Sequence, residues 1–446
     1  MVKRLGVCCL LLWLSFPIQA VDWGGSSTFF ATVESDDDLD WFSEGLLALW
    51  LNAPLGPSYS MVSQGSFRAT TDPLYVADLD LLYLDGLSAV GEGMALGIRA
   101  GRFILDEFSG LVFEHRGDGA ELWLSSRPAI TRIGAVYTGL LIKPNSAVVM
   151  SKLDEIDDRD DDVRLAPRRL VAIAEVQFVE PLPRTDLTLA LVVQQDLRDS
   201  SDLIEEGETI LDETSGGLLD TRHALLGVHG ALGPRWFYEL TGGVQFGRVL
   251  AYVPDSESGT GARYAYADIR SYVGSIGFEH YVPGPRAGRL ALGALYSSGD
   301  SDSRSVREGG RSDKVTQFQP IATQPIGLVA AAQPGNLVTV GVDYSLRPFR
   351  VTAPSSLSEL QTGISATLLL RALDSGPVDM AGVNVDHGGR YLGTEVGASV
   401  VYRPFYDLGM ALQAGVLLPN SSSAGPLDNE WQDPRFALQA ELSLSF

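Results

Sequence analysis

Arginine carries most of the chemistry that this sequence could perform. Of its 33 basic residues, only Lys3, Lys143, Lys152 and Lys314 are lysines. A guanidinium offers a rigid fork of donors that suits carboxylates and other oxygen-rich groups. In segments of alternating polarity, the polar side carries charges of both signs: Arg99, Arg132, Arg169, Arg289, Arg347, Arg371 and Arg403, with Glu175, Asp343, Glu395 and Glu441.

Two roles fit these charged side chains. If they line a water-filled channel, the arginines would guide an anionic or hydroxylated, sugar-like solute. Alternatively, opposite charges pair across neighbouring strands and brace a wall. The second interpretation is the simpler one, because the polar side of such a wall needs filling whether or not the protein conducts.

An acidic run between residues 154 and 162 is the candidate metal site. Its carboxylates could hold Ca²⁺ or bridge to lipopolysaccharide through divalent ions, and the candidate ligands are Asp157, Asp158, Asp160, Asp161 and Asp162. The run lacks the glycine at position six and the glutamate at position twelve of an EF-hand loop. A solvated acidic loop is therefore the favoured interpretation.

Catalytic residues are sparse. Histidine occurs only at 115, 223, 229, 280 and 387. His223 and His229 share one side of a predicted strand, but six residues separate them by about 20 Å, too far to share a metal. The sequence contains neither zincin spacing nor a G-x-S-x-G elbow. We therefore predict no enzyme activity and no cofactor. The alternative is a hydrolase whose Ser, His and carboxylate come together from different strands.

The first twenty residues predict a signal peptide. Lys3 and Arg4 precede an apolar run over residues 5–16, and Ala20 supplies a small residue before cleavage. Both cysteines, Cys8 and Cys9, lie within this segment, so residues 21–446 contain none. A lipoprotein is the alternative. The net charge of −23, without clustered Lys and Arg, argues against nucleic-acid binding.

Alternation of apolar and polar residues identifies the elements that position these side chains. It is clearest from Arg435 to Phe446, where one side carries Phe436, Leu438, Ala440, Leu442, Leu444 and Phe446. This ending resembles the terminal strand that the barrel-assembly machinery recognises in outer-membrane proteins. We predict that this strand closes a barrel, with Phe436, Leu442, Leu444 and Phe446 as its marker residues.

The same alternation recurs along the chain and predicts roughly 16 to 18 strands of membrane-spanning length. The candidate strands are 27–33, 43–52, 57–69, 74–85, 94–104, 119–125, 130–142, 168–179, 185–196, 221–232, 235–250, 264–281, 287–298, 336–346, 362–373, 391–403, 406–417 and 435–446. Long polar connections between the predicted strands alternate with short ones. The long connections are 143–167, 197–220, 299–324, 374–389 and 419–434. The fold class is therefore all-β, a single transmembrane antiparallel up-and-down barrel over residues 21–446, surrounded by outer-membrane lipid.

Short motifs spread over residues 94–446 resemble the alginate-export family of outer-membrane barrels. They are Gly101-Arg102-Phe103 with Asp106, Gly117-Asp118-Gly119-Ala120, Ser297-Ser298-Gly299-Asp300 and Tyr391-Leu392-Gly393-Thr394-Glu395. The resemblance implies an 18-stranded barrel with an Arg-lined conduit for an anionic polymer or similar solute. The strong acidity and the scarcity of lysine depart from the family, which leaves its fold better supported than its substrate.

The function predicted from the sequence is passive diffusion or export of small hydrophilic solutes through an Arg-containing lumen. The first alternative is a surface barrel whose loops, above all 299–324, act in adhesion or envelope structure. The second alternative is the outer-membrane hydrolase.

Overall fold

The computed structural model describes residues 21–35, 39–71, 75–198, 216–254, 262–310, 312–351, 357–422 and 425–446. The predicted signal peptide, residues 1–20, lies outside the described residues. Among those that are described, no helix is long and apolar enough to cross a membrane.

Strands dominate the structure. They are β1 (Asp22–Ser35), β2 (Leu39–Pro54), β3 (Tyr59–Thr70), β4 (Tyr75–Gly91), β5 (Met94–Asp106), β6 (Glu114–Ser125), β7 (Ala129–Tyr137), β8 (Arg169–Leu182), β9 (Thr185–Asp196), β10 (Gly217–Gly233), β11 (Trp236–Pro254), β12 (Ala262–Val282), β13 (Gly288–Ser297), β14 (Lys314–Val315), β15 (Leu337–Leu346), β16 (Gln361–Arg371), β17 (Tyr391–Phe405), β18 (Leu408–Pro419) and β19 (Arg435–Ser445). The short helices are η1 (Lys143–Asn145), α2 (Lys152–Arg159), η3 (Leu357–Glu359) and η4 (Asn429–Trp431).

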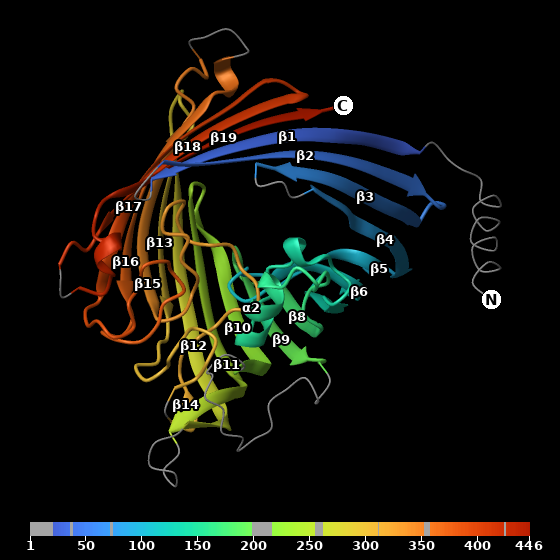
Figure 1. Cartoon of the computed structure of the whole chain (residues 1–446). Helices are drawn as coiled ribbons and strands as arrows, with labels where there is room; N and C mark the ends of the chain where they lie inside the picture. The colour runs from blue at the N-terminus through green and yellow to red at the C-terminus, as the bar shows by residue number, and fades with distance from the viewer. Residues whose placement is uncertain are drawn as a thin grey trace.

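The strands close into one antiparallel barrel (Figure 1). Each barrel strand pairs with its neighbours in sequence, and β1 pairs with both β2 and β19. The two-residue β14 is an exception, because it belongs to the long connection after β13 and pairs with β12 in parallel. Without β14, the described sheet has 18 strands, so the predicted all-β up-and-down barrel is confirmed.

The seam of the barrel is held by the last residues of the chain. Register pairs run from Ser26 with Ser445 to Glu34 with Ala437. Beyond them, Phe446 N–H donates to the Gly25 carbonyl and Gly25 N–H donates to the Phe446 carbonyl, each at 3.0 Å. The marker residues Phe436, Leu442 and Leu444 lie on the outward face of β19.

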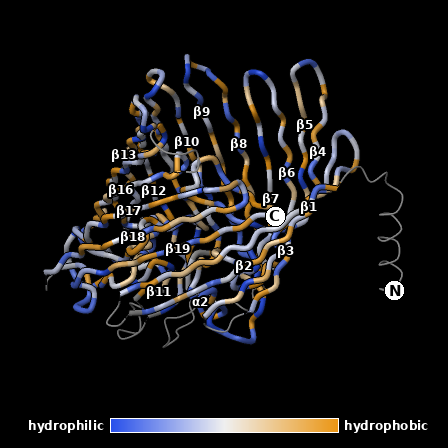
Figure 2. Tube along the Cα trace, turned by 90° about the horizontal axis from the view of Figure 1, so that it is seen from above, coloured by the Kyte–Doolittle hydropathy of each residue, from blue (hydrophilic) through white to orange (hydrophobic). Residues whose placement is uncertain are grey.

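Hydrophobic and hydrophilic residues alternate along the barrel strands (Figure 2). The apolar side chains of this alternation are exposed on the outer face of the wall. Met410, Leu412 and Val416 on β18 face outward and are 40–45% exposed, a surface suited to lipid. Short turns join the strands at the rim that holds Gly25 and Phe446, and long connections leave the other rim. The long-connection rim is therefore the external one.

Candidate functional site

The hairpin of β5 and β6 leaves the barrel wall and enters the lumen. Pairing between β4 and β5 stops at Leu82 with Arg102, and pairing between β6 and β7 stops at Asp118 with Tyr137. Pairing between β5 and β6 nevertheless continues to Asp106 with Glu114. The tip of this hairpin is thus free of both neighbours, and it carries apolar residues into the interior of the barrel.

Two glycines and an ion pair mark the point where the hairpin departs. Gly101 lies opposite Gly119, and Arg102 lies opposite Asp118. A Cβ at Gly119 would come within 1.9 Å of the Ala135 carbonyl oxygen, so no larger residue fits there. The Arg102 guanidinium contacts Asp118 at 2.8 Å and Asp78 at 3.6 Å. The paired glycine and charge motifs of the sequence therefore build the bend.

The long connection between β13 and β15, residues 298–336, crosses the lumen and packs on the hairpin tip. Ile321 and Ala322 N–H groups donate to the Val112 carbonyl at 2.9 and 3.1 Å, and Phe113 forms a bridge with Ala322. Residues 299–324 were expected to be an external loop. Apolar residues such as Phe318 and Ile321 instead draw the segment inward, where both side chains are buried.

Polar groups on the wall hold this inward connection in place. Gln245 on β11 exchanges two hydrogen bonds with the backbone of Gln319, at 3.0 and 3.1 Å. On the far side, the Glu395 carboxylate of β17 accepts backbone N–H groups from Leu328, Val329 and Ala330 at 2.6, 3.2 and 2.9 Å. The connection therefore spans the lumen from β11 to β17.

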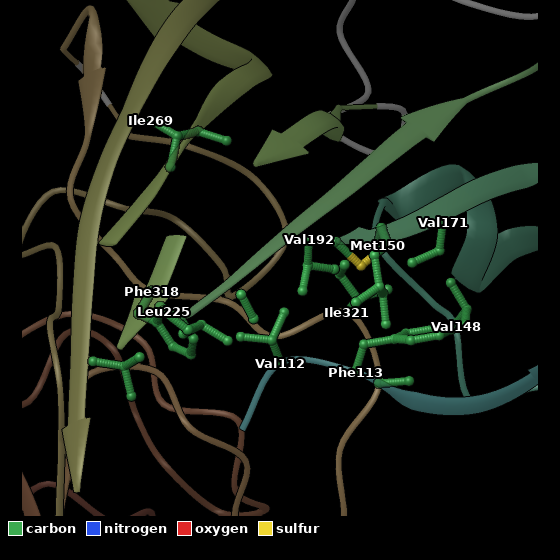
Figure 3. Close-up of a cluster of buried hydrophobic side chains, with 14 of the residues drawn as sticks. Val112, Phe113, Val148, Met150, Val171, Val192, Leu225, Ile269, Phe318 and Ile321 are labelled. Atoms are coloured by element: carbon green, nitrogen blue, oxygen red, sulfur yellow. The ribbon is translucent and has the colours of Figure 1, made fainter. Parts of the chain in front are cut away.

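A third inward segment, residues 138–168, carries α2. Ser151 caps α2 through a reciprocal capping box with Asp154. Val148 and Met150 of this segment join the hairpin tip and the 298–336 connection in one buried apolar cluster (Figure 3). This cluster lies inside the barrel, so the external half of the lumen is narrowed by packed protein rather than left open.

Arg169 and Arg371, both expected to line the pore, are completely buried anchors for loops. The Arg169 guanidinium contacts Asp154 at 2.7 Å and Asp196 at 3.3 Å, which ties the 138–168 segment to the wall. Arg371 donates to the carbonyls of His387 at 2.6 Å and Pro426 at 3.3 Å. Alternation gives their side of the strand correctly, but the inward loops cover them.

On β5 to β8, the expected pore-lining charges form a continuous network. Arg99 contacts Asp85 at 3.0 Å and Glu121 at 3.8 Å. Arg132 contacts Glu121 at 3.4 Å and Glu175 at 3.3 Å. The guanidinium groups here are partnered by carboxylates, which is the bracing arrangement considered from the sequence.

The remaining expected charges lie nearer the short turns. Arg289 on β13 forms ion pairs with Glu279 and, at 3.4 Å, with Asp343. Arg347 follows β15 and contacts Glu359 at 3.4 Å. Arg403 is exposed near the end of β17.

A cavity of about 1120 Å³ lies in the lumen on the short-turn side of the inward segments. Phe108 from the hairpin tip forms part of its lining. The cavity lining contains one arginine, Arg184, and one histidine, His229. It also contains six carboxylates, which are Glu175, Glu180, Asp186, Glu239, Glu279 and Asp343. Arg132 and Arg289 contact three of these carboxylates, so six negative charges face three guanidinium groups. The cavity is acidic.

Glu107 fixes the conformation of the turn between β5 and β6 through hydrogen bonds to its backbone. Its buried carboxylate accepts the N–H of Ser109 at 2.6 Å and of Val112 at 3.0 Å, which shapes the turn that presents Phe108. Burial raises the pKa of the Glu107 carboxyl above its ordinary value, and these hydrogen bonds offset part of that rise.

The acidic run is divided between two structures. Asp157 and Asp158 lie in α2, whereas Asp160, Asp161 and Asp162 follow it and are exposed. The backbone carbonyls of Asp157 and Asp160 accept hydrogen bonds from Lys143. The described residues contain no group of three or more His, Cys, Asp or Glu arranged to hold a metal ion.

The two histidines of β10 lie in different environments. His223 is buried edge-on against Phe318, with 6.0 Å between ring centroids. His229 lies in the acidic cavity with its Nε2 3.3 Å from Asp186.

No protein-family model matches the sequence, and no curated protein is significantly similar to it in sequence. Solved structures from Pseudomonas aeruginosa do match its fold. OccK5 (OpdH) has 13% identity and a TM-score of 0.52, over 97% of this chain and 99% of that one. OccK2 (OpdF), solved in complex with glucuronate, has 12% identity and a TM-score of 0.57, over 96% and 98%. The outer-membrane protein OpdK has 12% identity and a TM-score of 0.54, over 95% and 99%.

The chain has the fold of an outer-membrane porin. The match covers almost the entire length of both chains, and the closed barrel with its apolar outer face is the architecture of a multi-pass outer-membrane barrel. At these identities the likeness concerns the fold, and the resemblance to the alginate-export family stays a prediction.

Proposed function

We propose that this porin-like barrel conducts small hydrophilic solutes by passive diffusion, and that its lumen prefers cations. The acidic cavity carries the proposal. Solutes that pass the narrowed external half would enter a space lined by an excess of carboxylates.

The size of the preference follows from the carboxylates that lack a basic partner. Among the described residues, Glu180 and Glu239 have no ion-pair partner, and both side chains are exposed to the cavity. Two unit charges 5 Å apart interact by about 1 to 3 kcal/mol at an effective dielectric constant between about 80 and 20. Two such carboxylates therefore favour a monovalent cation over an anion by roughly tenfold or more at low salt, and screening reduces this at high salt.

The sequence-based hypothesis of an anionic or sugar-like solute predicts the opposite preference. Its guiding arginines would need uncommitted guanidinium groups in the lumen. Arg99, Arg132 and Arg289 are instead in contact with carboxylates, which supports the cation proposal. Arg184 and Arg403 form no ion pair among the described residues, but the six carboxylates of the cavity lining outnumber them. The glucuronate in the OccK2 (OpdF) structure concerns that protein.

Reversal potentials in a planar bilayer with a tenfold KCl gradient test the proposal. The full chain should show cation selectivity that weakens in the E180Q/E239Q variant. The matched control is E92Q/E430Q, which removes two exposed carboxylates outside the cavity lining. Anion selectivity would instead support the arginine-guided pathway, and a bilayer without conductance would overturn the channel itself.

The alternatives from the sequence lead to separate measurements. An adhesin requires external loops, and loss of matrix binding on deleting residues 299–324 would favour it, although this segment packs inside the barrel. Release of fatty acid from phospholipid by the pure protein would favour a hydrolase. Recognition of β19 by the barrel-assembly machinery also stays a prediction.

A further inference from the structure

Three arginines face outward from adjacent strands near the external rim. Arg222 on β10, Arg248 on β11 and Arg270 on β12 alternate with buried inward residues such as His223 and Gln245. The register places Arg222 beside Phe246 and Phe246 beside Arg270 in one row. The next row toward the rim places Arg248 between Asp220 and Asp268. Lys314 on β14 is in register with Asp268.

Charge at these positions contrasts with the rest of the outer face. No described outward position of β15, β16, β18 or β19 carries a charged side chain. On β10 to β12 themselves, the row directly below the arginines is Ala224, Val244 and Tyr272, and apolar residues continue below it.

The apolar rows below the arginines have about the height of a lipid-facing band. From Arg222 to Gly230, eight residues span roughly 27 Å along the strand. A strand tilt of about 40° reduces this to roughly 21 Å along the membrane normal, close to the typical band of about 25 Å. The arginines therefore lie where lipid headgroups of the external leaflet begin.

The arginines surround a recess of about 490 Å³ that opens outward. Arg248 is held at 3.1 Å from Asp220, and its guanidinium lies 4.6 Å from the ring centroid of Tyr266. Arg270 and Asp268 are more loosely paired at 4.0 Å, and about two thirds of each side chain is exposed. Arg222 has no ion-pair partner among the described residues, so the recess keeps donors available.

We propose that this recess binds the phosphorylated sugar headgroup of lipopolysaccharide in the external leaflet. Guanidinium forks bind phosphate oxygens in two-point contacts, and the apolar environment below them strengthens such contacts. The acyl chains would lie over the rows of Ala224, Val244 and Tyr272. Asp220 and Asp268 pair with Arg248 and Arg270, and they limit affinity because they compete with phosphate for these guanidinium groups and repel it.

Native mass spectrometry of the full chain in detergent tests this proposal. The probes are bis-phosphorylated lipid A and the same lipid after removal of both phosphates, in EDTA so that divalent ions cannot bridge. The chain should bind the phosphorylated form at least tenfold more tightly. R222Q/R248Q/R270Q should abolish this preference, and the matched control R159Q/R164Q/R390Q, which removes three exposed arginines elsewhere, should keep it.

A second variant guards against a folding defect in the triple arginine variant. D220N/D268N removes the competing carboxylates, so it should bind phosphorylated lipid A several-fold more tightly than the parent chain. Weaker or unchanged binding by D220N/D268N would argue against the site. Equal affinity of the parent for both lipids, or an equal loss in the control variant, would also overturn the proposal.

Discussion

Glu395 is the residue through which the inward connection can be released with least damage to the barrel. Its carboxylate accepts three backbone N–H groups from Leu328, Val329 and Ala330, and it is 7% exposed. Glu395→Gln replaces one carboxylate oxygen by an amide group, which donates hydrogen bonds and repels the same N–H donors. The barrel wall keeps its backbone pairing with β16 and β18.

The expected effect follows from these three contacts. Hydrogen bonds to a charged group contribute about 1.5 to 3 kcal/mol each, and neighbouring bonds are not additive. A loss of about 3 kcal/mol is therefore reasonable for Glu395→Gln. Because about 1.4 kcal/mol changes an equilibrium tenfold, the released population of residues 326–332 should rise by about two orders of magnitude.

Single-channel recording measures this release. The variant should show a larger mean conductance and more frequent fluctuations, because the connection leaves the lumen intermittently. Glu441→Gln is the control, since Glu441 is an acid on β19 that accepts no hydrogen bond from the described residues of the 298–336 connection. Unchanged conductance and noise in a correctly folded Glu395→Gln protein would refute the assignment of this residue as the anchor.

Three further predictions concern stability and assembly. Arg169→Met removes the nearer of the two guanidinium groups that contact buried Asp154 and leaves Arg198 at 3.4 Å, so the free energy of unfolding in urea should fall by about 3 kcal/mol; a change below about 1 kcal/mol would contradict the anchor. Gly119→Val places side-chain atoms against the Ala135 carbonyl, so heat-modifiable electrophoresis should show little folded barrel, whereas normal assembly would show that the bend tolerates a side chain. The pKa of Glu107 is raised in the folded state, so its stabilising contribution is complete below pH 4.5 and is lost as pH rises through the raised pKa. Relative to E107Q, the parent should thus lose thermal stability from pH 4.5 toward neutrality, and parallel pH profiles would exclude this role.

Alternation along the sequence predicted the barrel because each strand has one lipid-facing and one lumen-facing side. It found every barrel strand, with the largest errors at the ends. The range 119–125 misses the first five residues of β6, since these lie in the inward hairpin tip and have no lipid-facing side. The range 130–142 extends past Tyr137, where the chain leaves the wall.

The candidate site was harder to predict because it depends on contacts between distant loops. Alternation placed Arg169 and Arg371 on the inner side, but nothing in their own segments shows that other loops bury them. Phe318 and Ile321 could have indicated the inward connection, since two large apolar residues are unusual in a polar external loop. The outward arginines could not be predicted as a cluster, because their closeness depends on the register of three neighbouring strands.

The seam between β1 and β19 also determines the order in which the barrel can form. The hydrogen bond from Phe436 N–H to the Ser35 hydroxyl joins residues 401 positions apart, whereas the other strands pair with sequence neighbours. Closing so long a segment costs more chain entropy than forming any hairpin, and slow folding accompanies such distant contacts. Zipping of hairpins should therefore precede the seam in folding, and the seam should be the first interface to separate when the barrel is pulled open.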